Sequence, residues 1–191
     1  MHRQRLALAA TLALTAAVTT GVVAQGTRAK ADIKGDGITG TAEFREVPAQ
    51  LTTAHDMKYM TGMKAVEVTI TVTGLKPGAH GVHLHAVGKC EAPGFTTAGG
   101  HFDPGPAGNM DPDMNHPFHM GDLPNLVADA SGKATLKAVT SRVTIADGPL
   151  SLFDADGSAI IVHGNPDQGI TGEAKSGVSG GPRVACGVIT K

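Results

Sequence analysis

The sequence predicts an all-β domain, a sandwich or barrel built from short strands. Segments of alternating apolar and polar residues recur along the chain, and 65–73 is the clearest of them. Gly-containing turns such as 131–132, 147–148 and 156–157 separate these segments. No segment keeps a helical period. The 26 glycines and the low aromatic content of 3% also suit short strands and turns better than a helical bundle.

The first 24 residues predict an export signal. Arg3 and Arg5 form a basic start, an apolar run extends to about Val18, and small residues allow cleavage after Ala24. The alternative is an uncleaved membrane anchor, which the threonines and the glycine late in the run disfavour. We therefore expect an exported protein, periplasmic or secreted, whose mature form has no membrane segment.

The mature chain is expected to be one ordinary domain. Cleavage leaves 167 of the 191 residues, enough to bury a real core. Loss of Arg3 and Arg5 reduces the 16 basic residues to 14 against 17 acidic ones, a net charge of −3. This balance is not the footprint of a nucleic-acid-binding protein. Residues 25–36 are polar and are expected to form a flexible N-terminal segment, so that the domain covers 37–191.

Strands and two long loops are predicted along this domain in order. The expected strands cover 38–47, 65–73, 80–86, 126–130, 132–143, 160–163 and 184–189. Residues 87–123 and 164–182 lack a strand pattern and are too long for turns. Long irregular loops inside a compact domain are usually functional. We therefore expect the functional site where these two loops meet the strands.

A histidine-rich stretch at 80–122 predicts a metal site. His83 and His85 alternate along an expected strand, so their side chains share one face and lie about 7 Å apart. Two imidazoles at this spacing can bind one metal ion. The stretch holds six of the nine histidines, and His163 adds another from far downstream.

Five motifs, in order and at similar spacings, resemble copper/zinc superoxide dismutases of the bacterial exported type. They are Gly81-x-His83-x-His85, Gly100-His101-Phe102-Asp103-Pro104, His119-x-Gly121-Asp122-Leu123, Val162-His163, and the run from Gly181 to Ile189. The resemblance covers about residues 37–190. It implies a flattened eight-stranded Greek-key β-barrel or sandwich with two long functional loops. It also implies a superoxide dismutase, which converts two superoxide anions to oxygen and hydrogen peroxide by copper redox cycling.

The resemblance implies a copper site and a structural zinc site. The copper ligands would be His83, His85, His101 and His163. Imidazole suits both oxidation states of copper. His101 would bridge to zinc, and His119 and Asp122 would be further zinc ligands.

The fourth zinc ligand is where this sequence departs from the family. Residues 107–110, where a histidine is expected, read Ala-Gly-Asn-Met. His116 is the candidate replacement, and a tight turn at Pro117 would let it face the same ion as His119. The alternatives are a site completed by water or Asp113, or an empty zinc site.

Other residues also match family positions. Asp167 matches a carboxylate that links the two metal sites, and His80 matches a structural histidine that is not a ligand. Arg183 matches an arginine that attracts and positions the anion. The resemblance thus assigns catalytic roles to Arg183 and to His101, which would carry a proton.

The two cysteines are expected to form a disulfide. An exported protein meets an oxidising compartment, where Cys90 and Cys186 would pair; two buried free thiols are the alternative. In the resembled family the matching bond ties the loop after the His-x-His strand to the last strand.

Two functions other than that of a zinc-containing superoxide dismutase are also considered. One is a copper-only dismutase with an incomplete zinc site, and the other is a non-enzymatic copper-binding or copper-buffering protein on the same fold. The intact copper set with Arg183 favours the enzyme. Met57, Met60 and Met63 could bind Cu(I) through their thioethers or serve as apolar gap-fillers. The sequence does not decide between monomer and homodimer.

Overall fold

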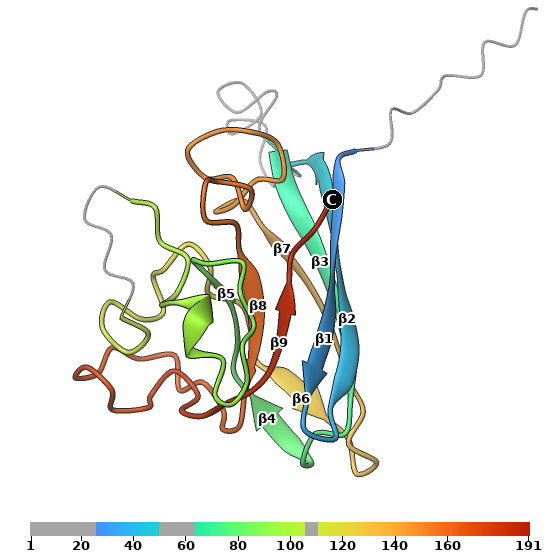
Figure 1. Ribbon diagram of the computed structural model, residues 1–191, viewed down its shortest axis with the longest axis vertical. Helices are drawn as coiled ribbons and strands as arrows, with labels where there is room; N and C mark the ends of the chain where they lie inside the picture. The colour runs from blue at the N-terminus through green and yellow to red at the C-terminus, as the bar shows by residue number, and fades with distance from the viewer. Residues whose placement is uncertain (1–25, 50–63, 106–110) are drawn as a thin grey trace, which may run out of the picture.

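The computed structural model describes residues 26–49, 64–105 and 111–191, which form an antiparallel barrel. Its strands are β1 (Arg28–Gly35), β2 (Thr39–Pro48), β3 (Lys64–Thr73), β4 (Gly78–His80), β5 (Val82–His85), β6 (Leu126–Ala128), β7 (Ala134–Thr140), β8 (Ala159–His163) and β9 (Arg183–Val188), with a 3-10 turn, η1 (Thr96–Ala98). They form one sheet in the order β4-β6-β7-β3-β2-β1-β9-β8-β5. Because β4 and β5 follow each other in the chain yet end this order, the sheet curls until it is nearly closed (Figure 1).

The all-β barrel expected from the sequence is confirmed, with one more strand than the eight expected. The extra strand arises at Gly81, which divides the expected strand 80–86 into β4 and β5. β4 pairs with β6, whereas β5 pairs with β8. A side chain at Gly81 would press on the carbonyl oxygen of Ser179 and the side chain of Asp167, so glycine lets the second long loop approach the barrel here.

The prediction of a flexible segment at 25–36 is wrong for residues 28–35, which form β1. Its inward positions carry Ala29, Ala31 and Ile33, and its charged residues point outward. Two of the three buried side chains are alanines, so the alternation is too weak in hydrophobicity to stand out in the sequence. β1 pairs along its length with β2 and at its end with β9. β1 therefore joins β2 to β9, the last strand of the chain, within the sheet.

The core lies inside the barrel and packs against one face of β5. β3 turns four β-branched residues inward, and Phe44, Leu126 and Ile160 fill the space around them. Full burial of each large apolar side chain stabilises the fold by about 1.5–3 kcal/mol. Val82 and Leu84 of β5 are part of this core. Because side chains alternate along a strand, this packing turns His83 and His85 to the opposite face.

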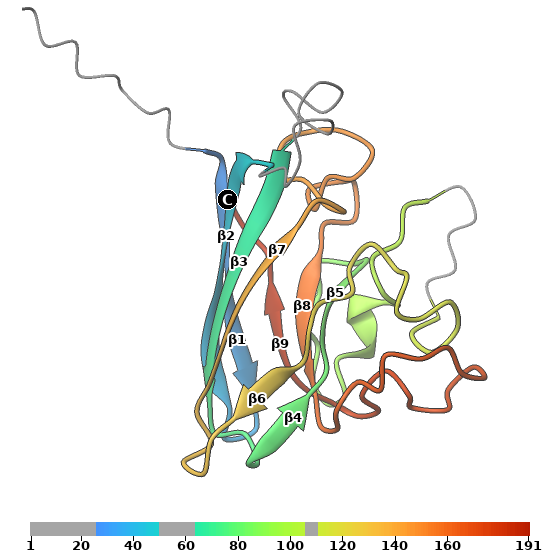
Figure 2. The same cartoon turned by 180° about the vertical axis from the view of Figure 1, so that it is seen from behind.

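The two long loops lie on the same side of the barrel, beside β5 and β8. They connect β5 to β6 and β8 to β9, and both views show them together (Figures 1 and 2). A disulfide between Cys90 and Cys186 joins the first loop to β9, as the sequence predicts. It closes a loop of 96 residues, which chain-entropy models value at roughly 4–5 kcal/mol. The bond therefore fixes the first long loop against the barrel.

A buried carboxylate fixes the far end of the barrel. Glu46 of β2 accepts hydrogen bonds from the backbone amides of Ile145 (2.9 Å) and Ala146 (2.8 Å). It also pairs with Lys64 at 3.1 Å. Burial opposes the charged form, but these three contacts outweigh burial and lower the pKa of Glu46. The ionised side chain thus connects β2 to the segment between β7 and β8.

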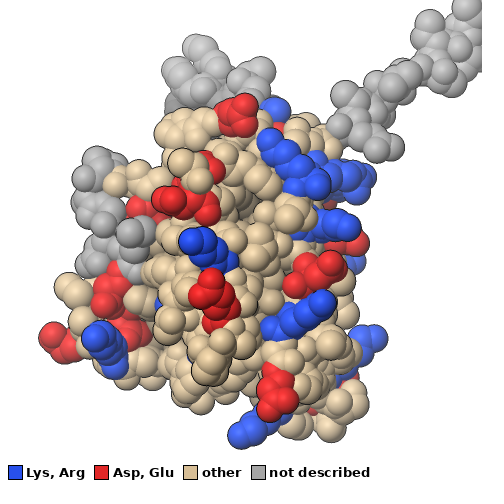
Figure 3. Space-filling view, in the orientation of Figure 1, with Lys and Arg blue, Asp and Glu red and all other residues tan. Residues whose placement is uncertain are grey.

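The exposed surface carries both signs of charge. Figure 3 shows acidic and basic side chains over one face, with Lys and Arg gathered along the edge formed by β1 and β2. In the described ranges, no helix is long and apolar enough to cross a bilayer. The expected signal, 1–24, and the three methionines of 57–63 lie outside the described residues.

Candidate metal centre

Backbone pairing places the first two loop residues of the site beside β5. The amide of Phe102 donates to the carbonyl of Leu84 at 2.8 Å, and the amide of Leu84 donates to the carbonyl of Gly121 at 2.9 Å. His101 and Asp122, the neighbours of Phe102 and Gly121, are thereby aligned with β5. A side chain at Gly121 would lie 2.4 Å from the carbonyl oxygen of Leu84, so only glycine permits this approach.

A bulge places His163 opposite β5. The pairing of β8 with β9 shifts register between Val162 and His163. A bulge of this kind re-aims the side chain at which pairing is interrupted. The imidazole of His163 consequently meets that of His83, with ring centroids 4.9 Å apart.

Four buried histidines converge in one cluster. Donor atoms of His83, His85, His101 and His163 lie within 4.8 Å of one another, and none of these residues is more than 2% exposed. The nitrogens without a hydrogen-bond partner are Nδ1 of His83 and Nε2 of the other three. A buried polar atom without a partner is costly, so this arrangement fits a bound metal ion. We call these four residues the first cluster.

The opposite nitrogen of each imidazole is held by the protein. His85 and His163 donate from Nδ1 to the carbonyls of Gly99 and Gly181, both at 3.0 Å. Nε2 of His83 lies 2.9 Å from Oδ2 of Asp167. Contacts of this kind fix the tautomer and turn the remaining lone pair toward a metal. Each side chain in the first cluster is therefore oriented in advance.

The environment of His85, His101 and His163 favours the neutral imidazole, the form that binds metals. Burial, followed by the neighbouring imidazoles, lowers the pKa of both His85 and His163 well below the usual value. Burial and His83 lower the pKa of His101 to about 3, against the opposing effect of Asp122. Neutral imidazole is also the form that suits a copper site.

A second cluster surrounds the carboxylate of Asp122. Its Oδ1 lies 2.7 Å from Nδ1 of His101, and its Oδ2 lies 3.2 Å from Nδ1 of both His116 and His119. Burial raises the pKa of Asp122, but the three imidazoles outweigh it and hold that pKa far below its usual range. Three imidazole nitrogens and one carboxylate match the donor set of a closed zinc site. His101 belongs to both clusters, with one ring nitrogen in each.

Asp167 lies between the two clusters. One of its oxygens contacts His83, and the other lies 2.6 Å from Nε2 of His116. Burial opposes its ionisation, yet these two imidazoles lower its pKa. Asn125 exchanges hydrogen bonds with the backbone of Asp167, at 2.8 and 2.9 Å. The carboxylate is therefore held where it can orient one histidine of each cluster.

The two other predicted site residues lie at the edge of the first cluster. His80 faces backbone carbonyls at both ring nitrogens, including that of His163 at 2.7 Å, so it supports the cluster from outside. Arg183 donates to the carbonyls of Phe95 (3.0 Å) and Gly99 (2.7 Å). Gly99 is also the acceptor of His85. This shared carbonyl places the guanidinium next to the first cluster.

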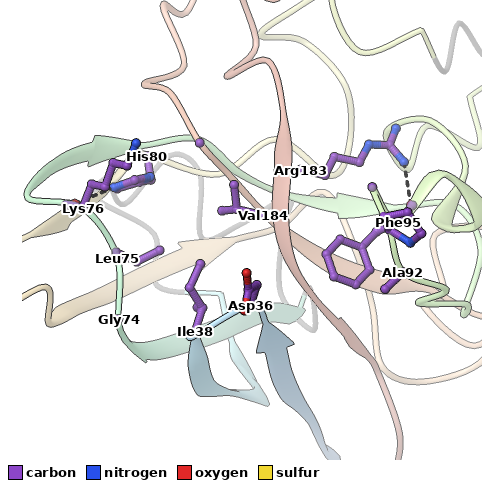
Figure 4. Close-up of a pocket in the computed structure, with 13 residues that line it drawn as sticks. Asp36, Ile38, Gly74, Leu75, Lys76, His80, Ala92, Phe95, Arg183 and Val184 are labelled. Carbon is purple, nitrogen blue, oxygen red and sulfur yellow. Dashed lines mark hydrogen bonds between the residues drawn. The ribbon is translucent and has the colours of Figure 1, made fainter.

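A separate pocket borders Arg183. It has a volume of about 470 Å³ and runs between the β1–β2 turn and the segment around Phe95. Figure 4 shows Arg183 directed from β9 toward Phe95, with Val184 and Ile38 further along the pocket. Its lining includes His80 and Arg183 but no member of the two clusters.

Comparison with known proteins gives the family. The model of the family described as copper/zinc superoxide dismutase matches residues 38–189. A superoxide dismutase [Cu-Zn] of Caulobacter vibrioides is 42% identical over 129 residues, which are 65% of this chain and 71% of that protein. Superoxide dismutase [Cu-Zn] 1 of Aquifex aeolicus is 35% identical over 130 residues, 65% of this chain and 72% of that protein. This chain belongs to the copper/zinc superoxide dismutase family.

Solved structures place the fold in the same superoxide dismutase family. A double mutant of a superoxide dismutase-like protein from Bacillus subtilis superposes with a TM-score of 0.63 and 28% identity. The match covers 83% of this chain and 94% of that one. The barrel thus has the fold of superoxide dismutase-like proteins.

Sequence reasoning missed one residue that supports the second cluster of this superoxide dismutase homologue. Arg142, which follows β7, donates to the carbonyls of His119 (2.9 Å) and Asp122 (2.6 Å), and more weakly to that of Pro117. Its guanidinium thus fixes the backbone of two cluster residues to the barrel. Its acceptors are backbone carbonyls, which leave no signal in the sequence.

Proposed function

We propose that this protein is a superoxide dismutase that converts two superoxide anions and two protons into oxygen and hydrogen peroxide. The observation that carries the proposal is the convergence of four buried imidazole nitrogens that have no protein partner. Family membership and the nearby Arg183 support the same reaction. The predicted signal supports action outside the cytoplasm.

His83, His85, His101 and His163 would hold copper. Bound copper would supply the one-electron redox chemistry by which one superoxide is oxidised to oxygen and another is reduced. The guanidinium of Arg183 attracts the anion and positions it; electrostatic steering of superoxide is a known property of this enzyme family. His101, whose Nε2 lies in the first cluster, would carry a proton toward the forming peroxide.

The second cluster would hold zinc through His101, His116, His119 and Asp122. His83 also lies within reach of this cluster, but its Nε2 is engaged by Asp167. His119 is favoured over His83 because its Nδ1 lies 3.2 Å from Asp122. A closed four-ligand site is typical of structural zinc. Zinc would therefore order the first long loop and fix Nδ1 of His101.

Removal of one copper ligand tests the proposal. His163→Ala should abolish dismutation and reduce copper binding, while circular dichroism shows that the barrel is retained. Near-wild-type activity of the copper-loaded variant would contradict the assignment of His163. A wild-type protein that binds copper stoichiometrically but does not dismutate superoxide would instead identify a copper-binding protein.

A further inference from the structure

Asp113 joins the two long loops. It is 3% exposed and lies three residues before His116. Its Oδ1 accepts hydrogen bonds from the amide (3.0 Å) and hydroxyl (2.8 Å) of Ser179, and its Oδ2 accepts one from the amide of Gly177 at 2.7 Å. Its backbone carbonyl accepts a fourth from the amide of Gly172 at 2.9 Å. One residue of the first loop thus receives four hydrogen bonds from the second.

These contacts exclude Asp113 as a zinc ligand, because its carboxylate instead binds the second long loop. Its carboxylate is engaged with the second loop and is not a member of either cluster. Burial opposes its ionisation, but the donors of Gly177 and Ser179 outweigh burial and lower its pKa. An ionised carboxylate with three donors from one short segment holds that segment in one conformation. The segment 177–179 therefore depends on Asp113 for its position.

The same segment leads directly to a residue of the first cluster. Gly181 accepts the Nδ1 hydrogen bond of His163 at 3.0 Å. A Cβ on Gly180 would lie 2.8 Å from Cβ of His163, so the backbone packs against this histidine. Any shift of 177–179 is passed to Gly180 and Gly181, and from there to the acceptor that orients His163.

We propose that Asp113 is a positioning residue that couples the order of the second cluster to the orientation of His163. When His116 and Asp122 are fixed by zinc, Asp113 is fixed with them and holds 177–179 in place. Nε2 of His163 is then directed into the first cluster. This connection is separate from that of Asp167, which reaches His83. The inference rests on the proposed function, because it requires zinc in the second cluster.

Hydrogen exchange on the mature protein, loaded with zinc alone, tests the coupling. The variants are Asp113→Asn and Ser179→Ala, and Asp147→Asn is the charge-matched control because Asp147 is 96% exposed. In wild type, zinc should slow amide exchange in both 113–122 and 177–181, by about tenfold or more. In Asp113→Asn, zinc should still protect 113–122 but not 177–181. In Ser179→Ala, the zinc-dependent protection of 177–181 should be reduced less than in Asp113→Asn. In the control Asp147→Asn, it should equal that of wild type.

Electron paramagnetic resonance of Cu(II) provides a readout at the first cluster. With zinc bound, the copper spectrum of Asp113→Asn should shift toward that of zinc-free wild type, since His163 is no longer held. Asp147→Asn should give the wild-type spectrum. Equal protection of 177–181 by zinc in wild type and Asp113→Asn, or identical copper spectra, would overturn the coupling while leaving the proposed function intact. Failure of wild type to bind zinc would overturn both the coupling and the zinc assignment.

Discussion

Oδ1 of Asp167 lies 2.6 Å from Nε2 of His116. This contact occupies the outer nitrogen of His116 and turns its Nδ1 toward Asp122, at 3.2 Å. Burial lowers the pKa of His116, but its contacts with the two carboxylates prevail and raise it to about 9. His116 is thereby brought to the second cluster from a position in the sequence where the family pattern does not place a ligand.

Removal of His116 should weaken zinc binding. In His116→Ala we expect zinc affinity to fall by roughly tenfold or more, since even losses outside the ligand shell cost that much. Copper binding should persist, because His116 is not part of the first cluster. Phe118→Ala is the matched control, since this side chain in the same loop is 70% exposed. Equal zinc affinities of wild type and His116→Ala in a titration would remove His116 from the site.

Reversal of the charge at Arg183 should slow the enzyme. Arg183→Glu would repel the anion, so the second-order rate should fall and its ionic-strength dependence should weaken or invert. Arg183→Lys is the control: it keeps the charge but cannot reproduce both contacts to Phe95 and Gly99. It should therefore keep the sign of the salt dependence. Pulse radiolysis over a range of salt concentrations measures the second-order rate and its salt dependence. An unchanged salt dependence in Arg183→Glu would show that the charge of Arg183 does not attract the anion.

Loss of the disulfide should destabilise the fold. Removal of a native disulfide typically costs about 2–5 kcal/mol, and the bond between Cys90 and Cys186 closes a long loop. We expect the double variant Cys90→Ser/Cys186→Ser to unfold at lower denaturant concentration. Mass spectrometry of the non-reduced wild type should show the loss of two hydrogens. Two freely alkylated thiols in protein isolated without reductant would contradict the bond.

Glu46 should make part of the stability depend on pH. Because its pKa is lower in the folded state than its usual 4.5, its contribution is present above that value and is lost as pH falls through the folded-state pKa. Glu46→Gln should therefore cost stability at pH 7, by about 1–3 kcal/mol, and flatten the acid decline below pH 4.5. Lys64 is largely exposed, so most of this effect comes from the amides of Ile145 and Ala146. Denaturation curves at several pH values measure the free energy of unfolding, and Glu43→Gln on the outer face of β2 is the control. If this free energy falls with pH in parallel for wild type and Glu46→Gln, the expectation is contradicted.

The elements that the sequence predicted share a local signal. Alternation identified β3 and the shared face of His83 and His85, whose ring centroids lie 6.5 Å apart. The sequence does not predict β1, because two of the three residues on its inner face are alanines. Their weak hydrophobicity contrasts too little with the charged residues between them to show the alternation of a strand. The roles of Asp113 and Arg142 could not be foreseen, since their partners are backbone groups in distant segments. Such contacts depend on how loops fold back, which neither periodicity nor motif spacing encodes.

The burial of all four histidines of the first cluster should slow the exchange of a bound metal ion. None is more than 2% exposed, so we expect a bulky chelator to reach the donor atoms only when the long loops open. Exchange is then limited by local unfolding, whose free energy the loop-to-loop hydrogen bonds and the disulfide both increase. A chelator with higher affinity would therefore remove the metal slowly, at a rate independent of its concentration. If the protein is exported, as we propose, a lost ion is diluted away, and the lifetime of the active protein should depend on this kinetic barrier more than on equilibrium affinity.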